Sequence, residues 1–331
     1  MFDKNIIEKI VKATGVKENE VILLHFWGDD SDRHILNTFA AEVSKLGASP
    51  LELQQCRNAN NDIFKNASEN TFNKKYFECF NNVDAVLEIF MHPPILLTEK
   101  LSKEQANNAN KYLQKLFKTF ATKKRFTQIR IPTIENSKDS NLNEDDFIKR
   151  MVQAYNIDYS ELKETCQNKI EEIKESNSIE IITANNNLLS LNVQNRNWIS
   201  DAGDGDMPCG EIYIAPIENK TNGSIFFKKL FVEDLNSFND ITITIKNGKI
   251  ESSTNKEFND FINSLPQNGN VICEFGLGLN KNVHDLCGYT VLDEKMDGTF
   301  HIAIGNNTMF GGNNDAPLHI DFLGTGEIKF N

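Results

Sequence analysis

The stretch HIAIGNNTMFGGNNDAPLHIDF, residues 301–322, contains two strand-like runs joined by a turn. Side chains alternate between the two faces of a strand, so LHIDF places His319 and Asp321 on one face. In HIAIG the same alternation puts His301 beside the small Ala303, which leaves room for a bound group. The connection is rich in Gly and Asn, which tolerate positive φ. It is therefore expected to fold the two strands side by side and bring His301 near His319.

Three acidic residues elsewhere in the C-terminal half extend this set. Glu211 opens the run EIYIAP after a loop that contains glycine and proline. Glu274 lies inside the apolar run VICEFGLGLN, where an ionised carboxylate is costly unless it is paired or bound to a cation. Glu294 comes shortly before His301, in LDEKMDGTF. Each acid alone also fits a solvated side chain or a salt bridge. The H-x-D pair alone also fits a histidine held by its neighbouring aspartate.

Taken together, five residues form a mixed nitrogen and oxygen donor set: Glu211, Glu274, His301, His319 and Asp321. Such a set suits zinc, manganese, cobalt or ferrous iron better than calcium. Two ions ~3.5–4 Å apart polarise a carbonyl and supply hydroxide, which is the chemistry of aminopeptidases and phosphatases. The expected cofactor is one or two ions of zinc, cobalt or manganese per chain, with iron(II) as the alternative.

The composition narrows the class of protein. A chain of 331 residues exceeds the usual size of a single core, so two domains are expected. A hydrophobic content of 39% and a charged content of 25% are typical of soluble globular proteins. No apolar run approaches the ~20 residues that span a bilayer. The N-terminal residues 1–16 have an amphipathic helix pattern rather than that of a signal peptide, so a cytoplasmic protein is expected.

The spacing of the cysteines excludes two cysteine motifs, and the net charge argues against one class of partner. The six cysteines form no C-x-x-C pair, which excludes a zinc ribbon and a thioredoxin-type motif. The net charge of −12 argues against a nucleic-acid partner, since phosphate binding needs concentrated Lys and Arg. No membrane partner is expected either. A peptide or another small molecule is the expected substrate.

The first 176 residues alternate between strand-like and helical runs. Strands are expected at 20–26, 49–55, 83–90 and 126–132. Helices are expected at 3–13, 31–46, 98–121, 144–155 and 159–175, with Thr98 as a possible cap. This order predicts an α/β domain whose parallel sheet is covered on both faces. The charged run KIEEIKESNS, residues 169–178, is expected to be the linker that follows it.

Residues 177–331 have a different pattern. Short alternating runs such as SIEIITAN, NLLSLNV and ITITIK are separated by Asn, Gly and Asp. The Asn-Gly pair at 247–248 is a strong signal for a two-residue hairpin. The predicted fold is therefore an α/β N-terminal domain with a parallel sheet, followed by a mostly antiparallel β domain, 177–331, that carries the metal site.

The order of these motifs resembles the aminopeptidase T family of bacterial metallopeptidases. The likeness lies in GE-x-x-x-AP at 210–216, a glutamate within an apolar strand, HIA-x-G at 301–305 and H-x-D-F at 319–322. The phrase GVKENEVILL, residues 15–24, also resembles that family ahead of its first strand. The resemblance implies metal ligation by the five residues named above, a site with two ions, and a homodimer whose partner helps to enclose the site.

The chain also departs from these peptidases. They carry a tyrosine seven residues after the first histidine, where this chain has Thr308. Their Glu-Asn phrase before that histidine is replaced by DEKMDGTF. The phrases EFGLGLN and FGG-x-N-x-A-x-x-H-x-D are instead similar to a divergent branch of the superfamily that includes the 2,5-dihydroxypyridine dioxygenases, which use one iron.

Three functions are compatible with these residues. The first is an aminopeptidase-type hydrolase that cleaves an amide bond, with Glu274 or Glu294 as general base. The second is a mononuclear non-haem iron dioxygenase that uses His301, His319 and Asp321. The third is a biosynthetic or binding protein that keeps the scaffold without this chemistry. The hydrolase is favoured because a ferrous site needs fewer carboxylates than the chain provides.

Overall fold

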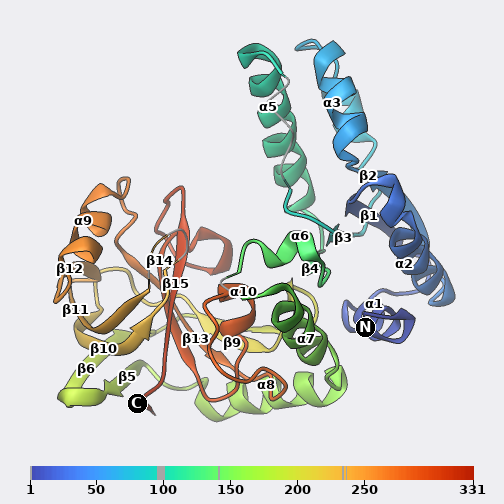
Figure 1. Ribbon diagram of the computed structural model, residues 1–331. Coiled ribbons are helices and arrows are strands. Elements are labelled where there is room, and N and C mark those ends of the chain that lie inside the picture. The colour runs from blue at the N-terminus through green and yellow to red at the C-terminus, as the bar shows by residue number, and fades with distance from the viewer. Residues whose placement is uncertain (1, 95–100, 141, 233–234, 236) are drawn as a thin grey trace. The chain divides into compact units, whose positions relative to one another are not determined.

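The computed structural model describes residues 2–94, 101–140, 142–232, 235 and 237–331 (Figure 1). The chain packs as two compact units. The first unit comprises 1–159 with 203–208, and the second comprises 160–202 with 209–331.

These units differ from the expected domains, 1–176 and 177–331. Helix α8 (Tyr159–Ile173) belongs almost wholly to the second unit, and the short segment 203–208 returns to the first. Part of the expected linker, residues 169–178, is therefore the last turn of a helix. The division into domains 1–176 and 177–331 stays a prediction.

A parallel sheet forms the centre of the first unit, as the sequence predicts. Its strand order is β2-β1-β3-β4-β8, and each neighbouring pair is parallel. The strands are β1 (Val21–Trp27), β2 (Ser49–Gln54), β3 (Ala85–Phe90), β4 (Arg125–Arg130) and β8 (Asp206–Met207). The two-residue β8 was not expected, because its residues lie in a Gly- and Asp-rich loop.

Helices surround this sheet. They are α1 (Lys4–Ala13), α2 (Arg33–Lys45), α3 (Arg57–Asn66), α4 (Lys74–Glu78), α5 (Lys103–Phe120), α6 (Ile134–Ser137) and α7 (Glu144–Tyr155), with a 3-10 turn, η1, at Asp30–Asp32. Helix α5 starts later than predicted. Ser102 caps it and forms a capping box with Gln105. The expected cap, Thr98, lies outside the described residues.

A buried carboxylate links three strands of the first unit. Glu88 on β3 accepts hydrogen bonds from the Trp27 indole at 3.0 Å and from the Gln128 amide at 2.7 Å. The Nδ1 atom of His25 lies 2.8 Å from the same carboxylate. Burial alone would raise the pKa of Glu88, but these partners, His25 first among them, hold that pKa below its ordinary value. The core of the sheet thus depends on one ionised acid.

Two antiparallel sheets make up most of the second unit, again as predicted. One has the order β12-β11-β10-β6-β5-β16, and the other has the order β15-β14-β13-β9-β7. The first sheet contains β5 (Ser178–Thr183), β6 (Asn187–Asn192), β10 (Asn222–Leu230), β11 (Phe238–Lys246), β12 (Lys249–Ser253) and β16 (Glu327–Phe330). The second sheet contains β7 (Ile199–Asp201), β9 (Glu211–Ile214), β13 (Ile272–Gly278), β14 (Phe300–Gly305) and β15 (His319–Gly324). Short helical segments complete the unit, namely η3 (Ala184–Asn186), α9 (Lys256–Ser264), α10 (Thr290–Asp293) and η4 (Thr308–Phe310).

The predicted Asn-Gly hairpin is confirmed. Asn247 and Gly248 have φ values of 50° and 75° and join β11 to β12. The turn is also hydrogen-bonded to two neighbouring segments. The Gly248 amide donates to the Thr221 carbonyl, and the Ile272 amide donates to the Gly248 carbonyl, both at 2.8 Å. Through Ile272, this hairpin fixes the start of strand β13.

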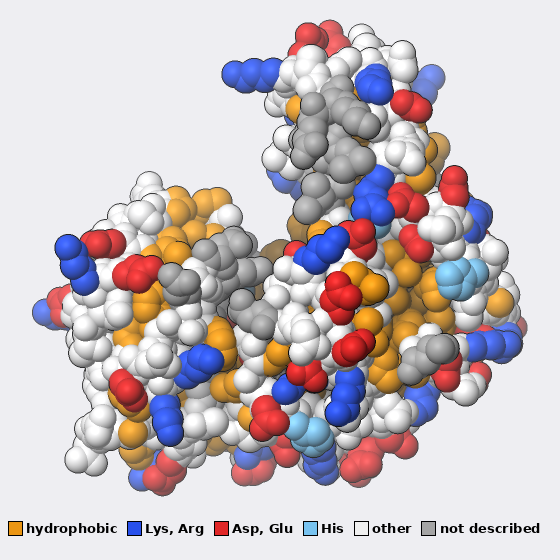
Figure 2. Space-filling view, in the orientation of Figure 1, with side chains coloured by type: hydrophobic (Ala, Val, Ile, Leu, Met, Phe, Trp, Pro, Cys, Tyr) orange, Lys and Arg blue, Asp and Glu red, His pale blue; other side chains and the backbone are white. Residues whose placement is uncertain are grey.

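The surface mixes charges of both signs. Acidic and basic side chains are interspersed over the face drawn in Figure 2. No helix among the described residues is long and apolar enough to cross a membrane.

Candidate metal centre

The five-stranded antiparallel sheet gathers the predicted ligands on one face. Residues paired across neighbouring strands point to the same side of a sheet. Glu274 on β13 pairs with Ala303 on β14, which in turn pairs with Asp321 on β15. His301 and His319 each lie two positions away from a member of this row and so share its face. The predicted hairpin between β14 and β15 is therefore confirmed.

The other edge of the same face carries more acids. Gly278 on β13 pairs with Glu211 on β9, and Glu211 pairs with Asp201 on β7. Glu211 is the first residue of its strand, as expected. All five predicted ligands thus lie on one face of one sheet, although they come from four strands.

Small residues leave space for the imidazole of His301. A Cβ atom on Gly276, the residue paired with His301, would lie 2.1 Å from that ring. Ala303 is fully buried beside it. The pairing also shifts by one residue between Ile272 and Glu274, which is a β-bulge. This bulge brings Glu274 opposite Ala303.

Three side chains converge most closely. Glu274, His319 and Asp321 each offer one ligand atom, and these atoms all lie within 4.8 Å of one another. The His319 Nε2 atom is 3.4 Å from one Glu274 oxygen and 3.5 Å from an Asp321 oxygen. Glu274 is buried, whereas the His319 side chain is 33% exposed. A substrate would therefore approach from the side of His319.

A backbone carbonyl and a cysteine sulfur orient His319. Its Nδ1 atom lies 2.9 Å from the Asn306 carbonyl oxygen and 3.6 Å from the Cys273 sulfur. The carbonyl can only accept, so Nδ1 carries the proton and donates it there. In the neutral imidazole, Nε2 then offers its lone pair toward Glu274 and Asp321. Metal-binding histidines are commonly held in this way.

His301 lies between Glu274 on β13 and Glu211 on β9. Its Nε2 atom is 3.2 Å from a Glu274 oxygen and 3.6 Å from the Glu211 Oε2 atom. The ring is almost completely buried. Burial alone would lower the pKa of His301, but the hydrogen bond to Glu274 and the charges of Glu211 and Glu274 raise it to about 9.

A buried lysine, which the sequence reasoning missed, completes the cluster. The Lys295 Nζ atom lies 2.6 Å from Glu211, 2.7 Å from Glu294 and 3.7 Å from Asp201. Its side chain is only 1% exposed. A lysine between acidic neighbours in DEKMDG is typical of a solvated turn, so the pattern gave no signal for it.

The carboxylates differ in their electrostatics. Burial raises the pKa of Glu211 to about 8, and Lys295 only partly offsets that effect. Burial likewise raises the pKa of Glu294 above its ordinary value. Burial would also raise the pKa of Asp321, but the contact with His319 holds it below its usual range. The raised pKa values of Glu211 and Glu294 show that Lys295 does not fully compensate the burial of these two acids.

The residues present fit a divalent cation. Five carboxylates surround the site, namely Asp201, Glu211, Glu274, Glu294 and Asp321, and Lys295 supplies a single ammonium. The Glu211 Oε2 atom is buried without a hydrogen-bond partner among the described residues. Buried charges are normally paired or bound to metals. A donor set of carboxylate oxygens and imidazole nitrogens suits a divalent transition metal or zinc.

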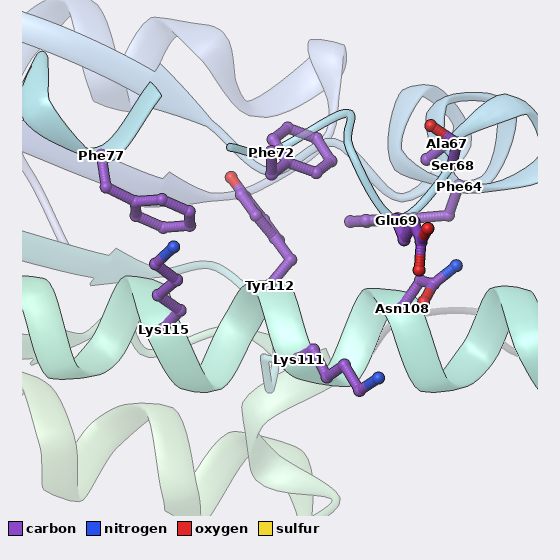
Figure 3. A pocket seen from close by; sticks show the side chains of 10 residues that line it. All are labelled: Phe64, Ala67, Ser68, Glu69, Phe72, Phe77, Asn108, Lys111, Tyr112 and Lys115. Carbon is purple, nitrogen blue, oxygen red and sulfur yellow. The ribbon is translucent and has the colours of Figure 1, made fainter. Parts of the chain in front are cut away.

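A separate pocket of about 160 Å³ lies in the first unit, between α5 and the segment that follows α3 (Figure 3). Phe64, Phe72, Phe77 and Tyr112 form its aromatic walls. The Lys115 ammonium lies 4.3 Å from the centre of the Phe77 ring. None of the predicted ligands lines this pocket.

Comparison with known proteins supplies the family. Residues 10–325 match the thermophilic metalloprotease family M29. The chain belongs to the M29 metalloproteases. This membership confirms the predicted resemblance to aminopeptidase T, implies a divalent metal and supports a metal-dependent peptidase. No curated protein matches the chain.

Two solved structures share the M29 fold of this chain. AmpT from Thermus thermophilus has a TM-score of 0.68 at 16% identity, covering 99% of this chain and 94% of AmpT. A 2,5-dihydroxypyridine dioxygenase from Pseudomonas putida KT2440 has a TM-score of 0.63, also at 16% identity, covering 99% and 93%. At this identity the two comparisons establish the fold.

Thr308, the departure from the aminopeptidase T pattern, lies in the connection between β14 and β15 of this M29 chain. Thr308 begins the short η4 segment, and its hydroxyl bonds to the Asn306 side chain at 2.9 Å. Phe310, in the same segment, places its ring centre 5.9 Å from that of His319. Thr308 therefore supports the loop beside the site.

Proposed function

We propose that this M29 protein is a metal-dependent aminopeptidase-type hydrolase that cleaves an amide bond in a peptide or a related small molecule. The observation that carries the proposal is the cluster of Glu274, His319 and Asp321 on one sheet face, with His301 and Glu211 beside it. A bound zinc, cobalt or manganese ion would polarise the substrate carbonyl and acidify a water molecule.

The residues of the chain have distinct proposed roles. Glu274, His319 and Asp321 would hold the ion, and His301 would complete the nitrogen donors. Glu274 was also expected as a possible general base, but it lies within the ligand cluster. Glu294 is outside that cluster and partly accessible, with 12% of its side chain exposed. We assign Glu294 the role of proton acceptor at its carboxylate oxygen and proton donor to the departing amine.

Substitutions at the site test this assignment. His319→Ala removes an orienting nitrogen ligand, so bound metal and peptidase activity should both be lost. Glu294→Gln should keep the metal but lower kcat by about 10²- to 10⁴-fold. The measurements are metal content by elemental analysis and turnover of a panel of aminoacyl anilides and peptides. His34→Ala, an exposed histidine of α2 in the first unit, is the matched control and should match the wild type.

The oxygenase alternative gives a different result in the same experiment. It requires iron(II) at His301, His319 and Asp321, and consumption of O₂ with a dihydroxypyridine. The compact cluster favours the hydrolase because it includes two carboxylates and one histidine, and His301 points toward further carboxylates. Oxygen uptake by the iron-loaded protein, without peptide cleavage by any metal form, would overturn the proposal.

We also propose a homodimer, as the family resemblance implies. Light scattering coupled to size-exclusion chromatography gives the mass directly, and a mass near 37.6 kDa would refute the dimer.

A further inference from the structure

We propose that the site binds one divalent ion per chain and that the ammonium of Lys295 takes the position of a second cation, beside Glu211 and Glu294. This inference rests on the proposed metal-dependent function. It concerns the number of ions and the role of a lysine that no sequence pattern identified.

The contacts divide the acids into two groups. Glu274 and Asp321 lie with His319 in the compact ligand cluster. Asp201, Glu211 and Glu294 instead surround Lys295, at 3.7, 2.6 and 2.7 Å from its Nζ atom. Each group therefore has its own place for positive charge. One divalent ion balances the two carboxylates of the first group, and the lysine serves the second.

Geometry at Glu211 excludes a bridging role. A carboxylate that bridges two ions uses both oxygens. Here the Oε1 atom of Glu211 is 2.6 Å from the ammonium, and only Oε2 is without a partner. Oε2 faces the His301 Nε2 atom at 3.6 Å. Glu211 is thus committed to Lys295 through Oε1 and lies outside the compact cluster of Glu274, His319 and Asp321.

Charge repulsion adds to this constraint. Lys295 is 1% exposed, so water does not screen its ammonium. A second divalent ion on Glu211 Oε1 or Glu294 Oε1 would lie directly against that ammonium. In a buried environment such a contact between like charges is strongly unfavourable. Lys295 is therefore a positioning residue: it holds Glu211 and Glu294 and excludes a second ion.

Ion counting tests the proposal without reference to activity. The wild-type protein is dialysed to equilibrium against Co²⁺, and the metal is measured by elemental analysis. One ion per chain is expected. Two ions would overturn the inference and leave the proposed hydrolase intact, whereas no ion would overturn both.

Substitutions at Lys295 identify the cause of that count. Lys295→Met removes the ammonium from three buried carboxylates, so a second ion should bind and the count should rise to two. Lys295→Arg keeps the charge and should retain one ion. A folded Lys295→Met protein that still binds one ion would refute the role of the lysine.

A second variant protects the test in case Lys295→Met does not fold. Glu211→Gln keeps the shape of the side chain and should leave the count at one, with the affinity for Co²⁺ changed by less than about tenfold. A fall in the count to none would mean that Glu211 is an essential ligand, and that would contradict the division of the acids into two groups.

Discussion

Glu88 shows how much of the first unit depends on a single side chain. Three donors from the two neighbouring strands, β1 and β4, converge on its carboxylate in the buried sheet. Glu88→Ala leaves these donors without their acceptor, so we expect a loss of about 3–5 kcal/mol in the free energy of unfolding. Glu52→Ala is the matched control, since Glu52 lies on β2 of the same sheet and pairs with the exposed Arg33. It should cost less than about 1 kcal/mol, measured for both by urea denaturation.

The same carboxylate predicts an acid-side signature. The folded-state pKa of Glu88 is lowered, so its contribution to stability is present above the unfolded value of about 4.3 and is lost as pH falls through the folded value. Wild-type stability should therefore decrease from about pH 5 downward more steeply than that of Glu88→Ala. Equal slopes for the two proteins would show that folding does not lower the pKa of Glu88.

Individual ligands were predictable from the sequence, but their electrostatic partners were not. Alternation along a strand placed His319 and Asp321 together, and the apolar neighbours of Glu274 indicated a carboxylate in need of a cation. The buried ion pairs of Lys295 could not be predicted, because two of its partners, Glu211 and Asp201, are distant in sequence. Glu211 and Asp201 come close to Lys295 only because their strands, β9 and β7, pair within the same sheet.

At the scale of elements, the hairpin at Asn247 and Gly248 is the feature that fixes the start of β13. A Cβ atom at Gly248 would lie 1.5 Å from the Glu218 carbonyl oxygen, and its φ of 75° already disfavours any side chain. Gly248→Ala should therefore cost about 2–5 kcal/mol. Because Ile272 bonds to Gly248, this variant should also weaken metal binding by Glu274.

Gly298→Ala separates the cost of the steric clash from the cost of the backbone strain at positive φ. Gly298 has a similar φ of 82°, but no atom lies within 4 Å of a Cβ built on it. Its substitution should cost only the conformational strain, about 1–2 kcal/mol. Thermal unfolding of both variants gives the comparison, and equal losses would contradict the predicted clash.

Elements were more predictable than their register. The Asn-Gly pair, the alternating runs and the helical spacing identified most helices and strands, because these signals are local. The β-bulge before Glu274 and the added strand β8 left no such signal. Both depend on contacts between segments far apart in the chain, which also explains why α8 joined the second unit rather than preceding a linker.

At the scale of the whole molecule, metal should stabilise one unit more than the other. All five predicted ligands lie in the second unit. A ligand that binds only the folded state at 100 times its Kd adds about 2.7 kcal/mol to stability. Chelation should therefore lower the Tm of the second unit by about 5–10 °C. The first unit should be unaffected, and His319→Ala should show no response to the chelator in differential scanning calorimetry.

The chain contains two tryptophans, and they are distributed one to each unit. Trp27 donates to Glu88 within the parallel sheet, whereas Trp198 packs edge-on against Phe275 on β13 and Phe330 on β16. The protein therefore has a natural fluorophore in each half. With Trp27 replaced by Phe, the remaining emission comes from beside the strand that carries Glu274, and it gives an optical record of the metal-bearing half as it loads, empties or unfolds.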